Sequence, residues 1–362
     1  MSIQITNAEQ TGDEAAKKSR TSDENHRNAT GLAPISAPPV TESETSVARR
    51  ACGLLIVVAA FVMLLTVNGL PTDPLQIFLW IVAVEIAWNS HLSWRTHLGF
   101  LRDWIGIVIL LVVYNFSRGF ADDLIPVHIT EMIHADTALA GWATGGEVPS
   151  VWLQNHLYDP LHTHWYDVAI SFVYFSHFVA APIVAAVLWF RNRTVWLSFV
   201  RRWFTLFALG LITYFVYPAM PPWLASDNGY LPPVEHGVAT RGWYAIGMAH
   251  GGNLLTEAQI NSANLIAAMP SLHSAFSLFI CVFFMQRVSR RWWPLLLAYP
   301  LAMAFTLMYS GEHYLIDVLV GWAFTGATFL LVHLAESWWS SQAEVPAEAC
   351  AVTADDAVLV SD

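Results

Sequence analysis

Two polar clusters interrupt the apolar sequence, and both contain residue types that can carry out acid–base or nucleophilic chemistry. One cluster, Met-Pro-Ser-Leu-His-Ser at 269–274, contains His273. The other, Tyr-Ser-Gly-Glu-His-Tyr-Leu-Ile-Asp at 309–317, contains His313 and Asp317. Each cluster leads into an apolar run, so the chemically useful residues stand at the start of two predicted helices.

His313 and Asp317 are four positions apart, so on a helix they share one face and the carboxylate can accept a hydrogen bond from one ring nitrogen. The other nitrogen would then be free to attack phosphorus and form a phosphohistidine. His273, at a matching depth on the neighbouring helix, could protonate the leaving oxygen and later activate the acceptor. A carboxylate within an apolar run costs at least ~2.5 kcal/mol, so Asp317 needs a partner or a catalytic purpose.

The two predicted helix starts also suit an anion. Pro270 fits a first helical turn, and Ser271 or Ser310 could cap the free backbone N–H groups. These N–H groups and the helix dipole favour a bound phosphate. We therefore expect Ser271 and Ser310 to belong to a substrate-binding region.

A metal site is the main chemical alternative, because two histidines and one aspartate are plausible zinc or iron ligands. The sequence adds neither a nearby cysteine nor an HExxH pair, and we predict no metal and no cofactor.

His177 and Glu85, which also stand in apolar runs, are more simply explained as packed hydrogen-bonding groups between helices.

Apolar helices must position these residues. Of the 362 residues, 55% are hydrophobic and 12% are charged, about half the charged fraction of a soluble domain. The predicted fold is an all-α, polytopic transmembrane bundle of about eight spans, in the range six to eight, with a six-helix catalytic core. The eight apolar runs are approximately 51–67, 75–90, 104–117, 167–190, 203–217, 272–286, 294–309 and 315–335.

Polar tails flank the predicted transmembrane catalytic domain, which covers residues 48–337. Residues 1–47 and 338–362 are poor in large apolar side chains and are predicted to be disordered. The net charge of −11 is attributed to solvation of the tails and loops, and no nucleic-acid partner is expected. The three cysteines show no disulfide or zinc pattern.

The positive residues predict the orientation, because Lys and Arg in short loops mark the cytoplasmic side. Six of the seventeen precede the first apolar run, and nine lie between alternate apolar runs. Both termini are therefore predicted to be cytoplasmic, with segments 118–165 and 218–271 and the turn near 310 extracytoplasmic. Arg118 and Arg241 are the two exceptions.

The clusters resemble the type 2 phosphatidic acid phosphatase superfamily, and in detail its inositol phosphorylceramide synthase-like branch. The matching segments are Pro-Ser-Leu-His at 270–273 and His-Tyr-Leu-Ile-Asp at 313–317, within a similar region of about 110–335. The resemblance implies that His313 is the nucleophile, that Asp317 orients it and that His273 is the acid or base. It also implies that no metal is required.

The sequence departs from the superfamily in its positive residues. The first motif, with a Lys and an Arg-Pro, is absent, and residue 311 is Gly where the phosphatases usually have Arg. Phosphoryl transfer needs positive charge, so Arg118 and Arg241 are predicted to replace these cations as phosphate ligands. Some outward polar residues could orient a polyol acceptor or simply solvate the loops: Asp122, Asp123, His162, His164 and Asp167.

We therefore predict an integral membrane phosphotransferase that moves a phosphoryl or phospho-headgroup from a lipid donor to an inositol-like alcohol, through a phosphohistidine at the extracytoplasmic face. A lipid phosphate phosphatase, with water as acceptor, is the nearest alternative. A membrane transporter or a metal-dependent membrane protein is the alternative of another class. A transport site belongs near the bilayer midplane, whereas His273 and His313 begin their helices at one face.

Overall fold

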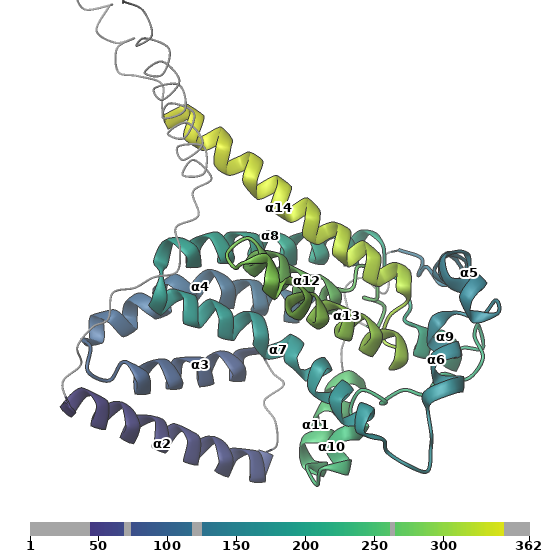
Figure 1. Ribbon diagram of the computed structural model, residues 1–362, viewed down its shortest axis with the longest axis horizontal. Coiled ribbons are helices and arrows are strands. Elements are labelled where there is room, and N and C mark those ends of the chain that lie inside the picture. The colour runs from purple at the N-terminus through teal and green to yellow at the C-terminus, as the bar shows by residue number, and fades with distance from the viewer. Residues whose placement is uncertain (1–43, 69–73, 118–124, 261–264, 344–362) are drawn as a thin grey trace, which may run out of the picture.

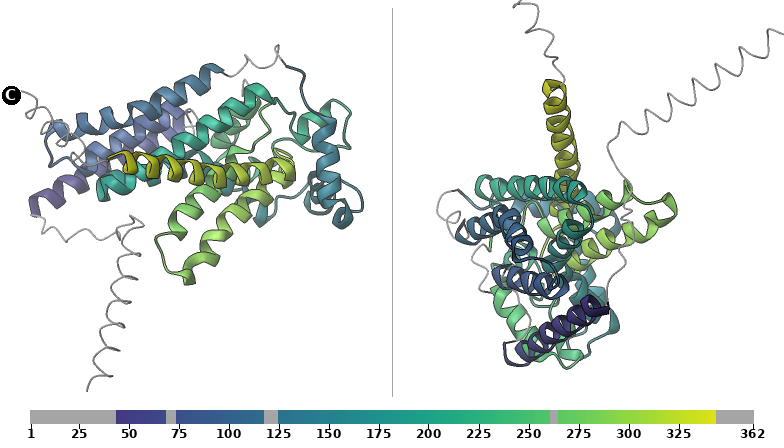
Figure 2. Two further views of the ribbon diagram at one scale, coloured as in Figure 1. Left: turned by 90° about the horizontal axis from the view of Figure 1, so that it is seen from above. Right: turned by 90° about the vertical axis from the view of Figure 1, so that its left-hand side faces the viewer.

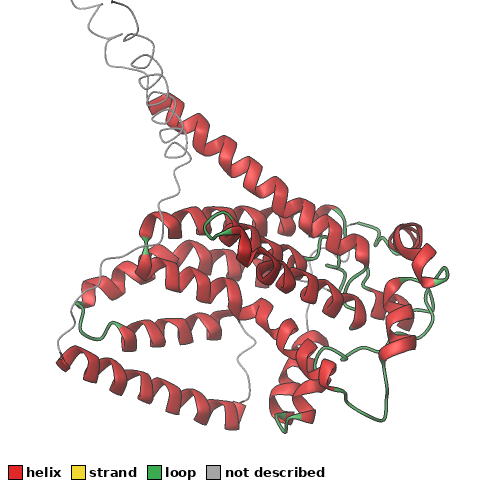
Figure 3. Cartoon of the chain, viewed as in Figure 1, coloured by secondary structure: helices red, strands yellow, loops and turns green. Residues whose placement is uncertain are grey.

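The computed structural model describes residues 44–68, 74–117, 125–260 and 265–343 (Figure 1). All regular secondary structure in these ranges is helical (Figure 3), apart from isolated bridges that join His128, Ala219 and Ala267. The helices are α2 (Glu44–Asn68), α3 (Pro74–Trp88), α4 (Trp94–Ser117), α5 (Thr130–Thr144), α6 (Pro149–Leu157), α7 (Trp165–Arg191), α8 (Arg193–Val216), α9 (Pro222–Asp227), α10 (Arg241–Ala245), α11 (Ala249–Ile260), α12 (Leu272–Met285), η1 (Arg290–Trp292), α13 (Trp293–Tyr309) and α14 (Leu315–Ala343).

Each predicted apolar run coincides with a helix, namely α2, α3, α4, α7, α8, α12, α13 or α14. Five helical stretches are long and apolar enough to cross a membrane: Ser46–Val67, Trp165–Arg191, Arg193–Val216, Arg290–Tyr309 and Leu315–Ser341. Two shorter apolar helices, Gln76–Trp88 and Leu272–Met285, accompany them. The predicted all-α, polytopic membrane fold is confirmed.

The segments predicted to be long outward loops instead contain short helices. Pro149 and Pro222 each begin one, and Gly145 ends α5 with a φ of 67°, because proline suits a first turn and glycine tolerates the left-handed cap. Figure 1 shows α5, α6 and α9 gathered at the end of the bundle where α14 begins.

The helical part also extends slightly beyond the predicted domain limits. Helix α2 begins at Glu44, and α14 continues to Ala343. The remainder of both predicted tails, residues 1–43 and 344–362, lies outside the described residues.

The core is a set of aromatic side chains between α4, α7, α8 and α12. Phe100, Trp104, Phe199, Phe279 and Phe283 are each no more than 1% exposed and belong to one apolar cluster. By contrast, none of the described side chains of α2 is buried, and Figure 2 shows this helix at the edge of the bundle. An apolar helix so exposed is suited to a lipid environment.

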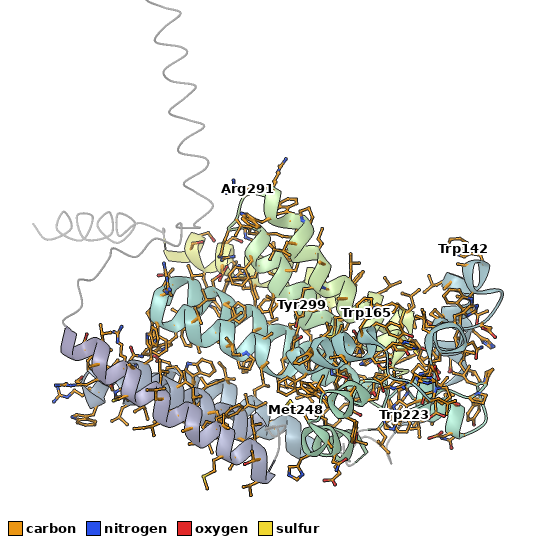
Figure 4. All side chains as sticks on the ribbon, turned by 60° about the horizontal axis from the view of Figure 1, so that its bottom comes forward. Trp142, Trp165, Trp223, Met248, Arg291 and Tyr299 are labelled. Carbon is orange, nitrogen blue, oxygen red and sulfur yellow. The ribbon has the colours of Figure 1, made fainter. Side chains whose placement is uncertain are left out.

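Ion pairs fasten the end of the bundle opposite to α5 and α9. Arg202 binds Glu336 at 2.8 Å, which joins the start of α8 to the end of α14, and Arg193 pairs with Asp103 of α4. In Figure 4, Arg291 lies well away from Trp223, the labelled residue of α9.

Glu85 is buried with both carboxylate oxygens within 2.9 Å of His97 Nδ1, as expected for a packed polar group.

Helices α12 and α14 cross in close contact near Gly321. A Cβ atom at this position would lie 2.5 Å from Ser274 Oγ and even closer to the carbonyl oxygen of Ser271. Thr325 Oγ1 donates to the carbonyl oxygen of Ala275 at 2.9 Å. The absence of a side chain at Gly321 therefore allows the two backbones to approach.

We expect Gly321→Ala to lower the thermal stability of the purified protein in detergent by about 1–3 kcal/mol, because the added methyl group overpacks a contact with backbone. Gly326→Ala is the matched control, since a Cβ there meets nothing within 4 Å and alanine is the better helix former. Equal melting temperatures for the two variants would contradict the proposed role of this crossing.

Candidate active site

His313 lies in the turn before α14 and is only 6% exposed. Its Nδ1 is 2.9 Å from the carbonyl oxygen of Ala268 and 3.6 Å from Asp317 Oδ2. Because a carbonyl oxygen only accepts, Nδ1 carries the hydrogen and Nε2 keeps its lone pair. The local geometry therefore leaves one ring nitrogen able to act as a nucleophile.

The predicted hydrogen bond from His313 to Asp317 is not formed, although the two side chains are neighbours. Asp317 Oδ2 instead accepts the backbone N–H of Tyr314 at 2.9 Å. The free N–H groups at the start of a helix compete for any carboxylate in the first turn. Asp317 thus fixes the helix start, with its negative charge behind the His313 ring.

His273 stands in the first turn of α12, and its ring centroid is 5.6 Å from that of His313. The two predicted catalytic histidines are therefore brought together. On its other side, His273 contacts Tyr174 and His177 of α7, with ring centroids 5.1 and 3.8 Å away. His177 therefore packs between α7 and α12, as predicted, but its Nδ1 makes no hydrogen bond within the described residues.

The two predicted capping serines differ. Ser271 is the N-cap of α12, accepts the N–H of Ser274 at 3.3 Å, and donates its own N–H to the carbonyl oxygen of Asp317 at 3.1 Å. Ser310 instead follows the end of α13, and its hydroxyl donates to the carbonyl oxygen of Leu307. The expectation for Ser310 is wrong because α13 continues up to Tyr309 and α14 begins only at Leu315.

Asp136 is a site residue that the sequence did not reveal. It belongs to α5, is fully buried, and accepts the N–H groups of Leu315 and Ile316 at 2.9 and 2.8 Å. With Asp317 on Tyr314, carboxylates occupy three successive N–H groups at the start of α14. This helix start therefore does not offer those groups to a phosphate, in contrast to the prediction.

The turn between α13 and α14 requires glycine at position 311. Gly311 has a φ of 71°, and a Cβ there would lie 2.5 Å from Val234 Cγ1. Its carbonyl oxygen accepts the N–H of Trp223 at 3.1 Å. An arginine at this position would be strained, which explains the glycine in physical terms.

Polar side chains next to this turn hold it in place. Gln154 of α6 donates to the carbonyl oxygen of Tyr309 at 2.9 Å and accepts the N–H of Glu235 at 2.7 Å. Glu312 lies 3.7 Å from His236, whose ring stacks on Trp223. Burial raises the pKa of Glu312 to about 8 and lowers the pKa of His236, so a neutral pair is favoured near neutral pH.

Arg241 is bound to a neighbouring loop. Its Nη2 donates to the carbonyl oxygens of Asp159 and His162 at 2.7 and 2.9 Å, and its guanidinium lies over the Tyr158 ring. Its Nη1 is buried without a hydrogen-bond partner among the described residues. The other predicted phosphate ligand, Arg118, lies outside the described residues.

Three of the five residues predicted to orient an acceptor or to solvate the loops lie in the described part of the chain: His162, His164 and Asp167. Asp167 caps α7 by accepting the N–H of His164 at 2.8 Å, and it also accepts the Tyr309 hydroxyl at 3.1 Å. His162 is an exposed partner of Asp159, at 3.0 Å. Asp122 and Asp123 lie outside the described residues. Asp167 is therefore a structural residue rather than a free acceptor ligand.

A zinc or iron ion would need several donor side chains around one point. Within the described ranges, no group of three or more His, Cys, Asp and Glu side chains is arranged to hold a metal ion. His313 Nδ1 and Asp317 Oδ2 each bind a backbone group instead.

We expect Asp136→Asn to make the melting temperature in detergent less dependent on pH. Burial raises the pKa of Asp136 to about 7, so the folded protein binds this proton more tightly than the unfolded chain. Its contribution to stability is therefore complete below about pH 4 and is lost as the pH rises through about 7. Melting curves from pH 5 to 8 measure the difference, and identical slopes for both proteins would contradict it.

Comparison with known proteins bears on this geometry. The PAP2 superfamily matches residues 150–331, half of the chain. The chain is 26% identical over 273 residues to the phosphoinositol dihydroceramide synthase of Bacteroides thetaiotaomicron, covering 74% of this chain and 79% of that enzyme. It is 32% identical over 118 residues to the inositol phosphorylceramide synthase catalytic subunit of Saccharomyces cerevisiae, covering 31% of this chain and 28% of that subunit.

No solved structure matches the chain. The matched region contains α7, α12, α13 and most of α14, and therefore His273, His313 and Asp317. The resemblance noted in the two motifs is confirmed: the chain belongs to the PAP2 superfamily, as an integral membrane enzyme similar to inositol phosphorylceramide synthases.

Proposed function

We propose that this enzyme is a phosphotransferase that moves a phospho-headgroup from a lipid donor to an alcohol acceptor through a phosphohistidine on His313. The observation that carries the proposal is the hydrogen bond from His313 Nδ1 to the carbonyl oxygen of Ala268. It fixes the tautomer in which Nε2 is the nucleophile. His273, 5.6 Å away between ring centroids, is the matching acid and base.

In the first half-reaction, Nε2 of His313 attacks phosphorus and the bond from phosphorus to the lipid oxygen breaks. The proton on His273 moves to that leaving oxygen, which departs as an alcohol. Asp317 Oδ2, 3.6 Å from His313 Nδ1, stabilises the positive charge that the ring gains. One difficult displacement is thereby divided into two easier ones.

In the second half-reaction, His273 takes the proton of the acceptor hydroxyl and the acceptor oxygen attacks phosphorus. The bond from phosphorus to Nε2 breaks, and His313 returns to its starting state. The same residue acts as acid and then as base because the two steps run in opposite directions. Water in place of the alcohol would give hydrolysis by the same route.

The relatives indicate the chemical class of the substrates. Their names describe products that combine inositol, phosphate and a ceramide, and a phosphodiester between two alcohols is the product of such a transfer. Inositol can take part either as an alcohol acceptor or within the transferred headgroup. Both routes use the same attack at phosphorus, and labelled substrates distinguish them.

The extracytoplasmic face is the proposed side of the reaction. Arg193 is the first residue of α8, and Figure 1 shows this end of α8 at the opposite end of the bundle from the start of α14. Arg202 binds Glu336 in the second half of α14, and positive residues favour the cytoplasmic side. Arg241, whose Nη1 has no partner among the described residues, stays the proposed phosphate ligand on the outward side.

We expect His313→Ala to reduce headgroup transfer by on the order of 10⁴-fold or more, as for the loss of a covalent nucleophile, and His273→Ala to reduce it by about 10²–10⁴-fold. The measurement is single-turnover transfer in detergent with a chelator present. Phosphatidylinositol labelled at phosphorus is supplied with and without ceramide. In separate reactions, labelled free inositol is supplied together with an unlabelled phospholipid as the phosphoryl donor.

His333→Ala is the matched control, because His333 is an exposed histidine of α14. Label should remain attached to the wild-type protein in an acid-labile form and be absent from His313→Ala. Product formed only when an alcohol is added indicates transfer rather than hydrolysis. Full activity of His313→Ala would refute the proposed function.

A further inference from the structure

Helix α7 presents a third imidazole to the two catalytic histidines. The ring centroid of His177 is 3.8 Å from that of His273, which lies 5.6 Å from that of His313. Phe276 stacks on His177 at 5.4 Å and Phe178 contacts its edge at 5.1 Å. The three histidines therefore form a continuous row in an otherwise aromatic and apolar part of the bundle.

A nitrogen of His177 is left without a partner in this environment. Its Nδ1 is buried and makes no hydrogen bond within the described residues, and the same holds for His273 Nε2. His236 Nε2 is also buried without a hydrogen-bond partner among the described residues. By contrast, seven other described histidines make side-chain hydrogen bonds: His91, His97, His128, His156, His162, His250 and His313.

Packing alone does not account for a histidine at position 177. A buried polar atom without a partner costs about 1–3 kcal/mol, whereas a phenylalanine would make the same ring contacts with His273 and Phe276 at no such cost. An unpartnered nitrogen beside the His273 ring is available to a bound substrate.

The proposed reaction requires such an interaction. Phosphoryl transfer places charge on the non-bridging oxygens, and N–H donors must meet it. At the start of α14, Asp136 and Asp317 already occupy the N–H groups. Arg241 uses Nη2 on two loop carbonyl oxygens. Donors for phosphate are therefore scarce among the described residues near His313.

We propose that His177 is a substrate-binding residue that donates an imidazole N–H to a non-bridging oxygen of the transferring phosphodiester. This inference rests on the proposed function. His313 forms the bond to phosphorus, His273 moves the proton, and His177 holds an oxygen of the same group. A neutral imidazole carries one N–H and an imidazolium two, so His177 supplies this donor in either state.

The test compares two substitutions of His177 in the full-length protein. His177→Phe keeps the aromatic packing and removes the donor, whereas His177→Gln keeps an N–H donor. We expect His177→Phe to lower the single-turnover rate constant for release of the lipid alcohol by about 10²-fold, the usual loss for one such donor. His177→Gln should retain clearly more activity than His177→Phe. His333→Phe, on an exposed position of α14, is the control and should match the wild type.

The outcomes separate this inference from the proposed function. An active His313→Ala variant would refute the proposed function, whereas an inactive His313→Ala beside a fully active His177→Phe would refute the inference alone. Equal losses in His177→Phe and His177→Gln at unchanged melting temperature would also overturn it, because the donor would then be irrelevant. Should His177→Phe fail to fold in detergent, His177→Met supplies the apolar comparison.

Discussion

The crossing of α12 and α14 is the contact on which the rest of the site depends. The N–H of Ser271 binds the carbonyl oxygen of Asp317, and Ser274 Oγ lies 3.2 Å from the carbonyl oxygen of Val318, with Gly321 at the point of closest approach. These bonds join one backbone to the other, so they fix the relative depth of the helices independently of the catalytic side chains. A slip of one helical turn would be ~5.4 Å, which is comparable to the separation of the His273 and His313 rings. The register of this crossing therefore determines whether the two histidines can act on one phosphorus atom.

At the start of α14, the hydrogen bonds that hold the backbone rigid also reduce its partial positive charge. Asp136 and Asp317 satisfy N–H groups that would be costly to leave unpaired in an apolar surrounding, and they hold His313 in one position. In doing so they cancel the partial positive charge that α14 would otherwise direct at an anion. A site built in this way is well ordered but poor in cations. This condition makes imidazole groups, which can donate an N–H without a permanent charge, suitable ligands for a phosphate within a membrane bundle.

The sequence correctly predicted those features of the structure that depend on residues close together in the chain. A long apolar run in a membrane has few alternatives to a helix, so every predicted run is helical, and the spacing of His313 and Asp317 correctly predicted their proximity. It failed where groups compete or lie far apart in the chain. Asp317 bonds to Tyr314 instead of His313 because a backbone N–H is nearer, and Asp136 reaches α14 across 179 positions. The contact of His177 with His273 was not predicted, because a single histidine in an apolar helix gives no information about the helix that faces it.

Burial of the nucleophile bears on the choice between water and alcohol as acceptor. In the proposed mechanism, the phosphohistidine on His313 has to persist until the acceptor arrives, and an exposed one would meet water first. His313 is 6% exposed and Asp317 is fully buried, and the rings of Tyr174 and Phe276 extend the apolar wall beside His273 and His177. Such a surrounding limits the entry of water and favours an acceptor whose apolar part packs against these rings. The enclosure of His313 thus agrees with transfer to an alcohol carried by a lipid more readily than with hydrolysis.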